Sequence, residues 1–361
     1  MKISASAQRK PKYQVLVDEL RRQIKVRELQ PGDALPSYAE MRARHDVTIS
    51  TIDRVYGILE QEGLIERKQG HGTFVREAKQ ILTGNVGFIG SSPNGPGSVP
   101  YYAYLQEGVK QALAERQQSL LYLGTNDSWL GRHHDQVDGI LICNVENPTR
   151  ILSLMPSHLP CISIFNVIDG ITSIAPDDYN GARMAVKHLQ GLGHKRIACL
   201  MEMLPTQARR RYSGYQDGMF EAGLTIDPLW TRLTSNVAFG EDRKHYLRWG
   251  EEEMSRWIRT EWAEAQCSAL LVQNEMAAIG AIRAMQAEGI RVPHDVSVMG
   301  FDGTELCDYC IPTLCAMEVP LQQIGTRAVE VLEQLIYGQS FAPQSILFPL
   351  QVRHGNSVRS L

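Results

Sequence analysis

The chain has 361 residues, of which 43% are hydrophobic and 21% are charged, as in globular proteins of two or three domains. No apolar run approaches the roughly 18 residues that a membrane span requires, so we expect no membrane partner. The net charge of −3 hides an asymmetry, because residues 1–79 contain 15 Lys and Arg against 11 Asp and Glu, while acidic residues exceed basic ones in the remainder. A basic front segment on an acidic body is consistent with contact to a phosphate backbone.

The N-terminal segment and the cysteines bear on the cellular compartment. Residues 1–10 are basic and lack the apolar stretch of a secretory signal. Seven cysteines, an odd number, fit a reducing compartment better than a disulfide framework. We therefore expect a cytoplasmic protein.

The first 63 residues carry the start and stop signals of three helices. Apolar residues recur at helical spacing in a first amphipathic helix, and the Gln-Pro-Gly-Asp turn at residues 30–33 ends it. Ser37 followed by Glu40 forms a capping box for a second helix. Thr48 opens a third helix, and Gly63 is its expected C-cap. The apolar positions of the first and third helices are Tyr13, Leu16, Leu20, Ile24, Ile52, Val55, Tyr56 and Leu59.

A short hairpin is predicted directly after the third helix. Two β-prone runs in residues 64–75 flank Gly70 and Gly72, and glycine allows the positive φ angles of a tight turn. Arg67 and Lys68 make the first run basic. Helices joined by a short turn and followed by a basic hairpin are typical of a winged helix-turn-helix, which binds DNA.

Residues 12–75 resemble the GntR-type DNA-binding domain. The matching motifs are numerous and ordered: Tyr13-Gln14, Leu29-Gln-Pro-Gly-Asp33, Leu35-Pro-Ser37, Val47-Thr48, Leu59-Glu-Gln-Glu-Gly-Leu-Ile-Glu-Arg67 and Gln69-Gly-His-Gly-Thr-Phe-Val75. The resemblance implies that the third helix enters the major groove of double-stranded operator DNA and that the wing tip reaches the minor groove.

The resemblance, with the chemistry of the side chains, assigns the candidate DNA-binding residues Ser37, Thr48, Ser50, Thr51, Arg54, Arg67, Lys68, His71 and Gly72. Hydroxyl side chains at a helix start bond phosphates or bases, and arginine binds a phosphate or a guanine edge. The alternative is that the hydroxyl cluster only caps the helix. Many members of that family have arginine at the positions that Ala39, Ile49 and Asp53 occupy in this chain. The operator sequences of those relatives are therefore not assigned to this protein.

Residues 85–361 read as alternating strands and helices. Short continuous apolar runs between amphipathic segments favour buried parallel strands, and the length favours two α/β lobes over one. Ligands in such folds bind at the carboxyl ends of the strands and between lobes. The expected strands are 86–89, 120–123, 139–143, 161–165, 196–200, 269–272 and 296–299.

The body, over roughly residues 84–352, resembles the periplasmic-binding-protein-like effector domain of LacI/GalR-type regulators. The residues that carry this resemblance include Val137-Asp-Gly-Ile140, His188-Leu-Gln-Gly-Leu-Gly-His194, Arg211-Tyr-Ser-Gly-Tyr215 and Val292-Pro-His-Asp-Val-Ser-Val-Met-Gly-Phe-Asp302. A GntR-type head on such a body is the architecture of arabinose-repressor-like regulators. The resemblance implies a two-lobed type I fold with parallel sheets, and a homodimer.

The resemblance also places a small-molecule effector, expected to be a sugar, between the lobes. Aromatic faces would stack on the sugar ring, an arginine would donate forked hydrogen bonds, and polar side chains would bind hydroxyl groups. The candidate effector-binding residues are Tyr101, Tyr102, Asp177, Arg211, Asn274, Phe301 and Asp302. Helix-capping roles for Asn274 and Asp302, a loop-ordering role for Asp177 and a core role for Tyr102 stay open as alternatives. This set suits a neutral polyol, whereas an acidic ligand would fit better if Arg211 were the only charged contact.

No motif predicts catalysis, a cofactor or a metal. Gly84, Gly87 and Gly90 surround a strand rather than opening a helix, unlike a dinucleotide fingerprint. Cys307, Cys310 and Cys315 lack a second ligand pair at zinc-finger spacing.

We therefore expect a cytoplasmic bacterial repressor of transcription. Residues 1–76 would form the winged helix-turn-helix, 77–84 a linker, and 85–361 the two-lobed effector-binding and dimerisation domain. The alternatives are a transporter's solute-binding protein, which would lack a DNA-binding head, and an α/β enzyme, which would carry a catalytic motif.

Overall fold

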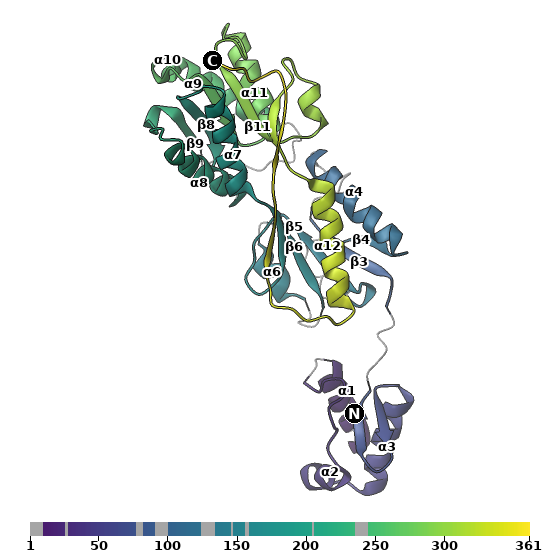
Figure 1. The fold of residues 1–361 in the computed structure, drawn as a ribbon. Helices are drawn as coiled ribbons and strands as arrows, with labels where there is room; N and C mark the ends of the chain where they lie inside the picture. The colour runs from purple at the N-terminus through teal and green to yellow at the C-terminus, as the bar shows by residue number, and fades with distance from the viewer. Residues whose placement is uncertain are drawn as a thin grey trace, which may run out of the picture. The chain divides into compact units, whose positions relative to one another are not determined.

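The structure is a computed structural model that describes residues 10–25, 28–76, 82–90, 100–123, 134–145, 147–155, 159–203, 206–234 and 245–361. It has two compact units, which we call the head, ending at residue 83, and the body, beginning at residue 84 (Figure 1). Most of the expected linker at 77–84 lies outside the described residues, so its course stays a prediction. In the described parts of the chain, no helix is long and apolar enough to cross a membrane.

The head is the expected three-helix unit with a hairpin. Its elements are α1 (Lys12–Lys25), α2 (Tyr38–His45), α3 (Ile49–Gln61), β1 (Ile65–Lys68) and β2 (Gly72–Val75). The capping box at the start of α2 is confirmed, because the backbone N–H of Glu40 donates to Ser37 and the N–H of Ser37 donates to the Glu40 carboxylate. The predicted stripe on α3 packs inward as the centre of the head core, since Ile52, Val55, Tyr56 and Leu59 have no exposed surface.

The C-terminus of α3 sets where the hairpin begins. Gly63 has a φ of +72°, its N–H donates to the carbonyl of Glu60, and the N–H of Leu64 donates to the carbonyl of Leu59. These paired bonds form a Schellman motif, which satisfies the last carbonyls of the helix. The expected C-cap role of Gly63 is confirmed, and the chain leaves the helix directly into β1.

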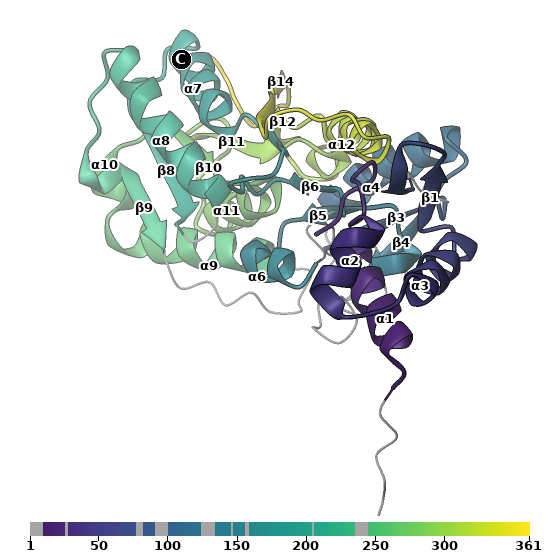
Figure 2. The same cartoon turned by 90° about the horizontal axis from the view of Figure 1, so that it is seen from below.

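The body contains two six-stranded sheets. The first has the order β13-β7-β6-β5-β3-β4 and is parallel throughout. Its strands are β3 (Asn85–Ile89), β4 (Ser119–Leu123), β5 (Gly139–Cys143), β6 (Cys161–Ile164), β7 (Ser173–Pro176) and β13 (Ser345–Phe348). Figures 1 and 2 show this sheet apart from the second one, so the expected two-lobed architecture is confirmed.

The second sheet has the order β14-β12-β11-β10-β8-β9 and is parallel except for β14. Its strands are β8 (Ile197–Glu202), β9 (Thr231–Thr234), β10 (Ala269–Val272), β11 (Ser297–Asp302), β12 (Cys315–Glu318) and β14 (Gln351–Arg353). The described chain passes between the two sheets after β7, after β12 and after β13. All seven strands expected from the sequence are present, although β6 ends one residue early, at Ile164, and β8 extends to Glu202.

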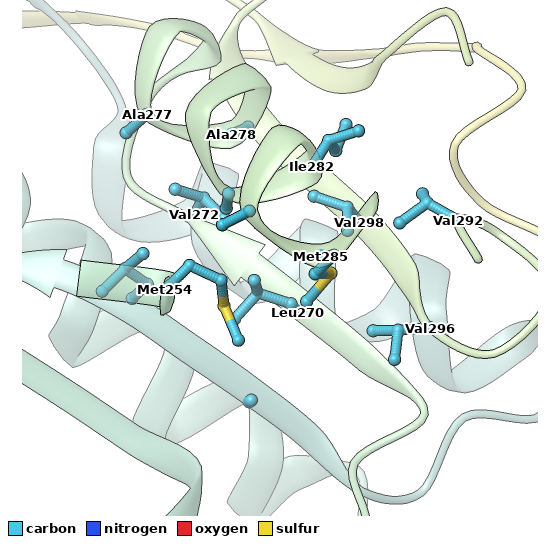
Figure 3. Close-up of a cluster of buried hydrophobic side chains, with 14 of the residues drawn as sticks. Met254, Leu270, Val272, Ala277, Ala278, Ile282, Met285, Val292, Val296 and Val298 are labelled. Carbon is cyan, nitrogen blue, oxygen red and sulfur yellow. The ribbon is translucent and has the colours of Figure 1, made fainter. Parts of the chain in front are cut away.

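Helices cover both sheets. The helices of the first lobe are α4 (Pro100–Glu115), α6 (Pro148–Ser153) and α12 (Leu321–Ile336); those of the second lobe are α7 (Asp178–Gly191), α8 (Thr206–Glu221), α9 (His245–Thr260), α10 (Trp262–Ala265) and α11 (Glu275–Ala287). Short 3-10 turns lie at His134–Gln136, Pro228–Trp230 and Glu305–Asp308. In Figure 3, Ile282 and Met285 of α11 lie over Leu270 and Val298 of the sheet, within the core of the second lobe.

Glycines allow three helix pairs to pack backbone against backbone. A Cβ atom on Gly108 of α4 would lie 2.1 Å from the carbonyl oxygen of Gln322 in α12, and one on Gly214 of α8 would lie 2.1 Å from that of Tyr179 in α7. Gly280 of α11 makes the same approach to Leu247 of α9. No other residue fits such contacts without moving a helix, so these glycines fix the spacing of each pair.

Candidate nucleic-acid interface and effector cleft

The start of α3 presents the three predicted hydroxyl groups together. Thr48 is the N-cap, and its Oγ1 accepts from the backbone N–H of Thr51 at 3.3 Å. The same oxygen lies 3.0 Å from Oγ of Ser50 and 2.9 Å from Oγ1 of Thr51. Thr48 and Ser50 are exposed. Capping therefore uses only part of the bonding capacity of this cluster, and hydroxyl donors stay available at the helix start.

Arg54 lies on α3 with its guanidinium carbon 3.9 Å above the ring centroid of Tyr13 in α1. This cation–π contact orients the side chain without neutralising its charge, and Arg54 stays exposed. A positively charged side chain held in place on the third helix can bind a phosphate or a base edge.

Arg67 connects the hairpin to α3. Its Nη1 donates to Oδ1 of Asp53 at 2.7 Å, and its Nε lies 3.1 Å from Oε2 of Glu60. The Tyr38 hydroxyl donates to the same Asp53 oxygen at 2.9 Å. The bond from Arg67, then that from Tyr38, lowers the pKa of Asp53, so this carboxylate is ionised but its charge is offset. The repulsion of phosphate that Asp53 could exert is thereby reduced.

The hairpin tip carries the other candidate wing residues. Lys68 pairs in register with Gly72 across the hairpin, and Gly70 and Gly72 have φ angles of +78° and +115°. His71 closes the turn through its N–H to the carbonyl of Lys68 at 2.9 Å. All of these residues are exposed, so the tip presents a lysine and a histidine on a glycine turn that can enter a groove.

In the body, Arg211 of α8 is the centre of a buried polar cluster. Its Nε donates to Oδ1 of Asp178 at 2.7 Å, its Nη1 donates to the backbone carbonyl of Gln273, and Oδ1 of Asp302 lies 3.4 Å from both terminal nitrogens. The guanidinium carbon also lies 4.4 Å from the ring centroid of Phe301. Three of the predicted effector residues, Arg211, Phe301 and Asp302, are therefore brought together.

Burial sets the protonation of this cluster. Burial raises the pKa of Asp302 to about 7, although the Arg211 charge opposes it. Burial likewise raises the pKa of Asp178 against the opposing effect of Arg211. For Arg211, burial lowers the pKa but the two carboxylates outweigh it. The guanidinium therefore stays charged and is shared between two acids.

Aromatic side chains of the first lobe lie beside the Arg211 cluster, where the effector cleft is predicted. The Tyr101 ring lies 5.5 Å from both Tyr102 and Phe165, measured between centroids. Nδ2 of Asn144 donates to the Tyr102 hydroxyl. Burial, then the Asp302 charge, raises the pKa of Tyr101, which places this tyrosine of the first lobe beside the Arg211 cluster of the second. Tyr101, Tyr102 and Phe165 thus form one aromatic cluster, and its contact with an effector stays a prediction.

Three residues near the cleft adopt backbone conformations that favour glycine. Asn144, Phe165 and Asp302 have φ angles of +44°, +72° and +82°, and they lie at or just after the carboxyl ends of β5, β6 and β11. Residues other than glycine with positive φ cost free energy and concentrate at functional sites. Their position supports this edge of the sheets as the binding site.

The other two predicted effector residues cap helices. Asp177 accepts from the N–H of Asn180 at 3.2 Å at the start of α7, and Asn274 accepts from the N–H of Ala277 at 2.8 Å at the start of α11. Among the described residues, neither side chain is seen bonded to Arg211. Thr304 rather than Asp302 caps the turn after β11. Effector contacts by Asp177 and Asn274 therefore stay predictions.

Asp178 was missed from the sequence although a signal was present. The buried positions of α7 are Asp178, Gly181, Ala182, Ala185, Val186 and Leu189, which is the i, i+3, i+4, i+7 spacing of one helix face. Extending that stripe backward would have selected Asp178 rather than Asp177 as the inward-facing acid. Phe165, Asn144 and Gln273 gave no such signal, because only the folded strand ends bring them to the cleft.

Comparison with known proteins gives two family matches. The family described as "Bacterial regulatory proteins, gntR family" matches residues 12–75, and the one described as "Periplasmic binding protein-like domain" matches residues 186–358. The chain is 29% identical over 272 residues to the HTH-type transcriptional repressor PurR of Haemophilus influenzae (strain PittEE), covering 72% of this chain and 76% of that protein. It is 28% identical to the Ribose operon repressor of Escherichia coli (strain K12), over 72% of this chain and 78% of the repressor.

Solved structures show the same fold. The transcriptional regulator CelR–cellobiose complex superimposes with a TM-score of 0.64 at 20% identity, covering 88% of this chain and 93% of that one. The lac repressor dimer bound to operator and the anti-inducer ONPF gives a TM-score of 0.64 at 23% identity, covering 78% of this chain and 96% of that one.

Proposed function

We propose that this chain, whose front part matches the gntR family and whose body matches the periplasmic binding protein-like domain and repressors such as PurR, is an effector-controlled repressor of transcription. The head would bind operator DNA through the start of α3 and the hairpin tip. The cleft around Arg211 would bind a small polar effector, a sugar. The protein would act in the cytoplasm as a homodimer, which matches the two-fold symmetry of operators that paired heads read.

The main observation in support of the effector site is that the Arg211 guanidinium is shared between two carboxylates beside the aromatic residues of the other lobe. Arg211 contacts Asp178, Asp302 and the Gln273 carbonyl in the second lobe, while Tyr101 of the first lobe faces the same cluster. A ligand that enters here contacts both lobes, so it changes the relative free energy of their arrangements. An effector shifts an equilibrium only through such differential contacts. A 100-fold change in operator affinity needs about 2.7 kcal/mol of coupling, which a few cleft hydrogen bonds can supply.

The relatives support a hydroxyl-bearing effector. One is named as a ribose operon repressor, and one structural neighbour holds cellobiose. The aromatic wall of Tyr101, Tyr102 and Phe165 suits the C–H face of a sugar ring, and the polar cluster opposite it suits hydroxyl groups.

Gel shifts with promoter fragments of the source genome test the proposal. We expect one or more fragments to be bound in preference to random DNA, and a sugar to change that affinity. Asp302→Ala should keep the operator shift and lose the response to the sugar. Equal binding of all DNA fragments would overturn the DNA-binding function, and an unchanged sugar response in Asp302→Ala would remove Asp302 from the effector site.

A further inference from the structure

Glu202 is a buried acidic residue near the Arg211 cluster that the site described above does not use. It is the last residue of β8, and its backbone N–H donates to Oε1 of Gln273 at 2.5 Å. The carbonyl of that same Gln273 accepts from Arg211. Burial raises the pKa of Tyr246, and the carboxylates of Glu202 and Asp302 raise it further, so both acids lie near this tyrosine. Glu202 therefore belongs to the row of strand ends beside the Arg211 cluster.

The carboxyl group of Glu202 lacks a well-formed bond within the part of the chain that the structure describes. The residue has no exposed surface, and among the described residues neither Oε1 nor Oε2 has a hydrogen-bond partner in good geometry, although the Gln273 side chain lies near enough to lower the pKa of Glu202 somewhat. Among the residues that the structure describes, no Lys or Arg forms an ion pair with it. A buried carboxylate without a partner costs several kcal/mol in general, and an orphaned polar group in a folded protein needs an explanation. A ligand that supplies the missing donors is such an explanation.

The charge balance of the cleft indicates which ligand fits. Arg211 is already shared between Asp178 and Asp302, so two carboxylates offset its charge and weaken its attraction for an anionic ligand. An anion would also face the acid of Glu202. Glu275, the other buried acid near Asp302, is satisfied by the backbone N–H and the hydroxyl of Thr304. Among the described acids of this cluster, Glu202 is thus the one without a well-formed bond, and a cation brought beside it would favour its ionised form.

We propose that the effector is an amino sugar, a hydroxyl-rich ring whose protonated amine forms an ion pair with Glu202. This inference rests on the proposed function, because it takes the cleft as the effector site. The aromatic wall accepts the ring, and the carboxylate accepts two charge-assisted hydrogen bonds from the ammonium group, which are stronger than bonds between neutral groups. The amine thus replaces the solvent that Glu202 gives up on folding.

Calorimetric titration of the full-length protein tests the proposal with matched probes. Glucosamine, galactosamine and mannosamine are each compared with the neutral parent sugar and with its N-acetyl derivative, which keeps the nitrogen but removes the charge. We expect at least one amino sugar to bind about 10-fold or more tightly than both neutral forms, a difference of about 1.4 kcal/mol. Glu202→Gln should abolish that preference. Glu264→Gln, which alters an exposed acid of the same lobe, should keep it.

A second variant separates recognition from folding. Glu202→Asp keeps the charge on a shorter side chain, so it should bind the amino sugar more weakly than the native protein while still preferring it to the neutral parent. Circular dichroism of each variant verifies that it is folded.

The inference would be overturned if an amino sugar and its parent sugar bound equally well, or if the preference for the amine persisted in Glu202→Gln. It would also be overturned if no amino sugar bound at about 10 mM, a concentration that detects binding free energies as weak as about −2.7 kcal/mol. The proposed function is tested separately. If a neutral sugar changed the affinity for the operator, effector control would be supported, but the inference that the effector carries an amine would be wrong.

Discussion

Arg211 and Asp178 form an ion pair of 2.7 Å in which the exposed fractions of the side chains are only 7% and 2%. The pair between Arg291 and Asp295 has the same length, but 71% and 38% of those side chains are exposed. Distance alone therefore does not distinguish them. Breaking a buried pair leaves an uncompensated charge in a medium of low dielectric constant, whereas an exposed pair is screened by water.

Arg211→Ala is expected to destabilise the body strongly. Asp178 and Asp302 would both lose their cation, at a cost of about 3–5 kcal/mol, whereas Arg291→Ala should cost at most about 1 kcal/mol. Urea unfolding followed by tryptophan fluorescence measures both. Similar midpoints for the two variants would contradict the proposed importance of the buried cluster. In the folded fraction of Arg211→Ala, the effector response should be lost while operator binding is retained.

Arg54→Ala is expected to weaken operator binding by about 10-fold or more if this guanidinium contacts phosphate or guanine. The slope of the logarithm of affinity against the logarithm of salt concentration should also decrease by about 0.9, as one phosphate contact is lost. Arg291→Ala, in the body, is the control. An unchanged gel shift would show that α3 does not present Arg54 to DNA.

Arg67 is expected to act on DNA partly through Asp53. Arg67→Ala exposes the Asp53 carboxylate, so operator affinity should fall about 10-fold, or about 1.4 kcal/mol. Asp53→Asn in the same chain should restore part of that loss, because the repelling charge is gone. A double-mutant cycle measured by gel shift gives the coupling. If Asp53→Asn restores nothing, Arg67 acts on the phosphate backbone alone.

Glu202 predicts a pH dependence of stability. Burial raises the pKa of Glu202 to about 7 from an ordinary value of 4.5. Between these values the unfolded chain has released the proton while the folded chain retains it, so raising the pH lowers the free energy of unfolding. Glu202→Gln removes this penalty. The variant should match the native protein near pH 4 and exceed its stability at pH 8, by at most about 3 kcal/mol.

The groups near Glu202 are the same in both proteins of that comparison. Tyr246 from α9, Gln273 after β10 and Asp302 from β11 are present in both, and Tyr246 stays protonated over this pH range, so the difference between the proteins reports mainly on Glu202. Urea midpoints at pH 4, 6 and 8 provide the measurement. Parallel profiles for the native protein and Glu202→Gln would mean that this carboxylate is ionised in the folded state without cost.

The sequence predicted the head almost completely because its signals are local. The capping box at Ser37, the N-cap at Thr48 and the C-cap glycine at 63 each act within a few residues. Seven strands of the body were also predicted, since a strand buried on both faces is a continuous apolar run. The interior strands β7 and β12 were missed although they are largely buried. The edge strands β9, β13 and β14 were not predicted. Their residues are largely half-buried or exposed, so only the neighbouring strand defines them.

The cleft was predicted in part for a different reason. Arg211, Phe301 and Asp302 were found through family resemblance, which carries roles that recur at fixed positions. Glu202 carries no pattern in the sequence, because an acid at the end of an apolar strand reads as an ordinary exposed terminus. Its significance comes from its burial without a well-formed bond among the described residues, and that environment is built by residues more than 40 positions away, such as Tyr246 and Gln273.

The close approach at Gly214 determines how far the guanidinium of Arg211 can reach. Gly214 is one turn along α8 from Arg211, and the carbonyl it approaches belongs to Tyr179, the neighbour of Asp178. A methyl group at position 214 would push α8 away from α7 and lengthen the distance between the Arg211 guanidinium and the Asp178 carboxylate. A substitution at Gly214 would therefore change ligand selectivity through the spacing of two helices, although Gly214 itself contacts no ligand.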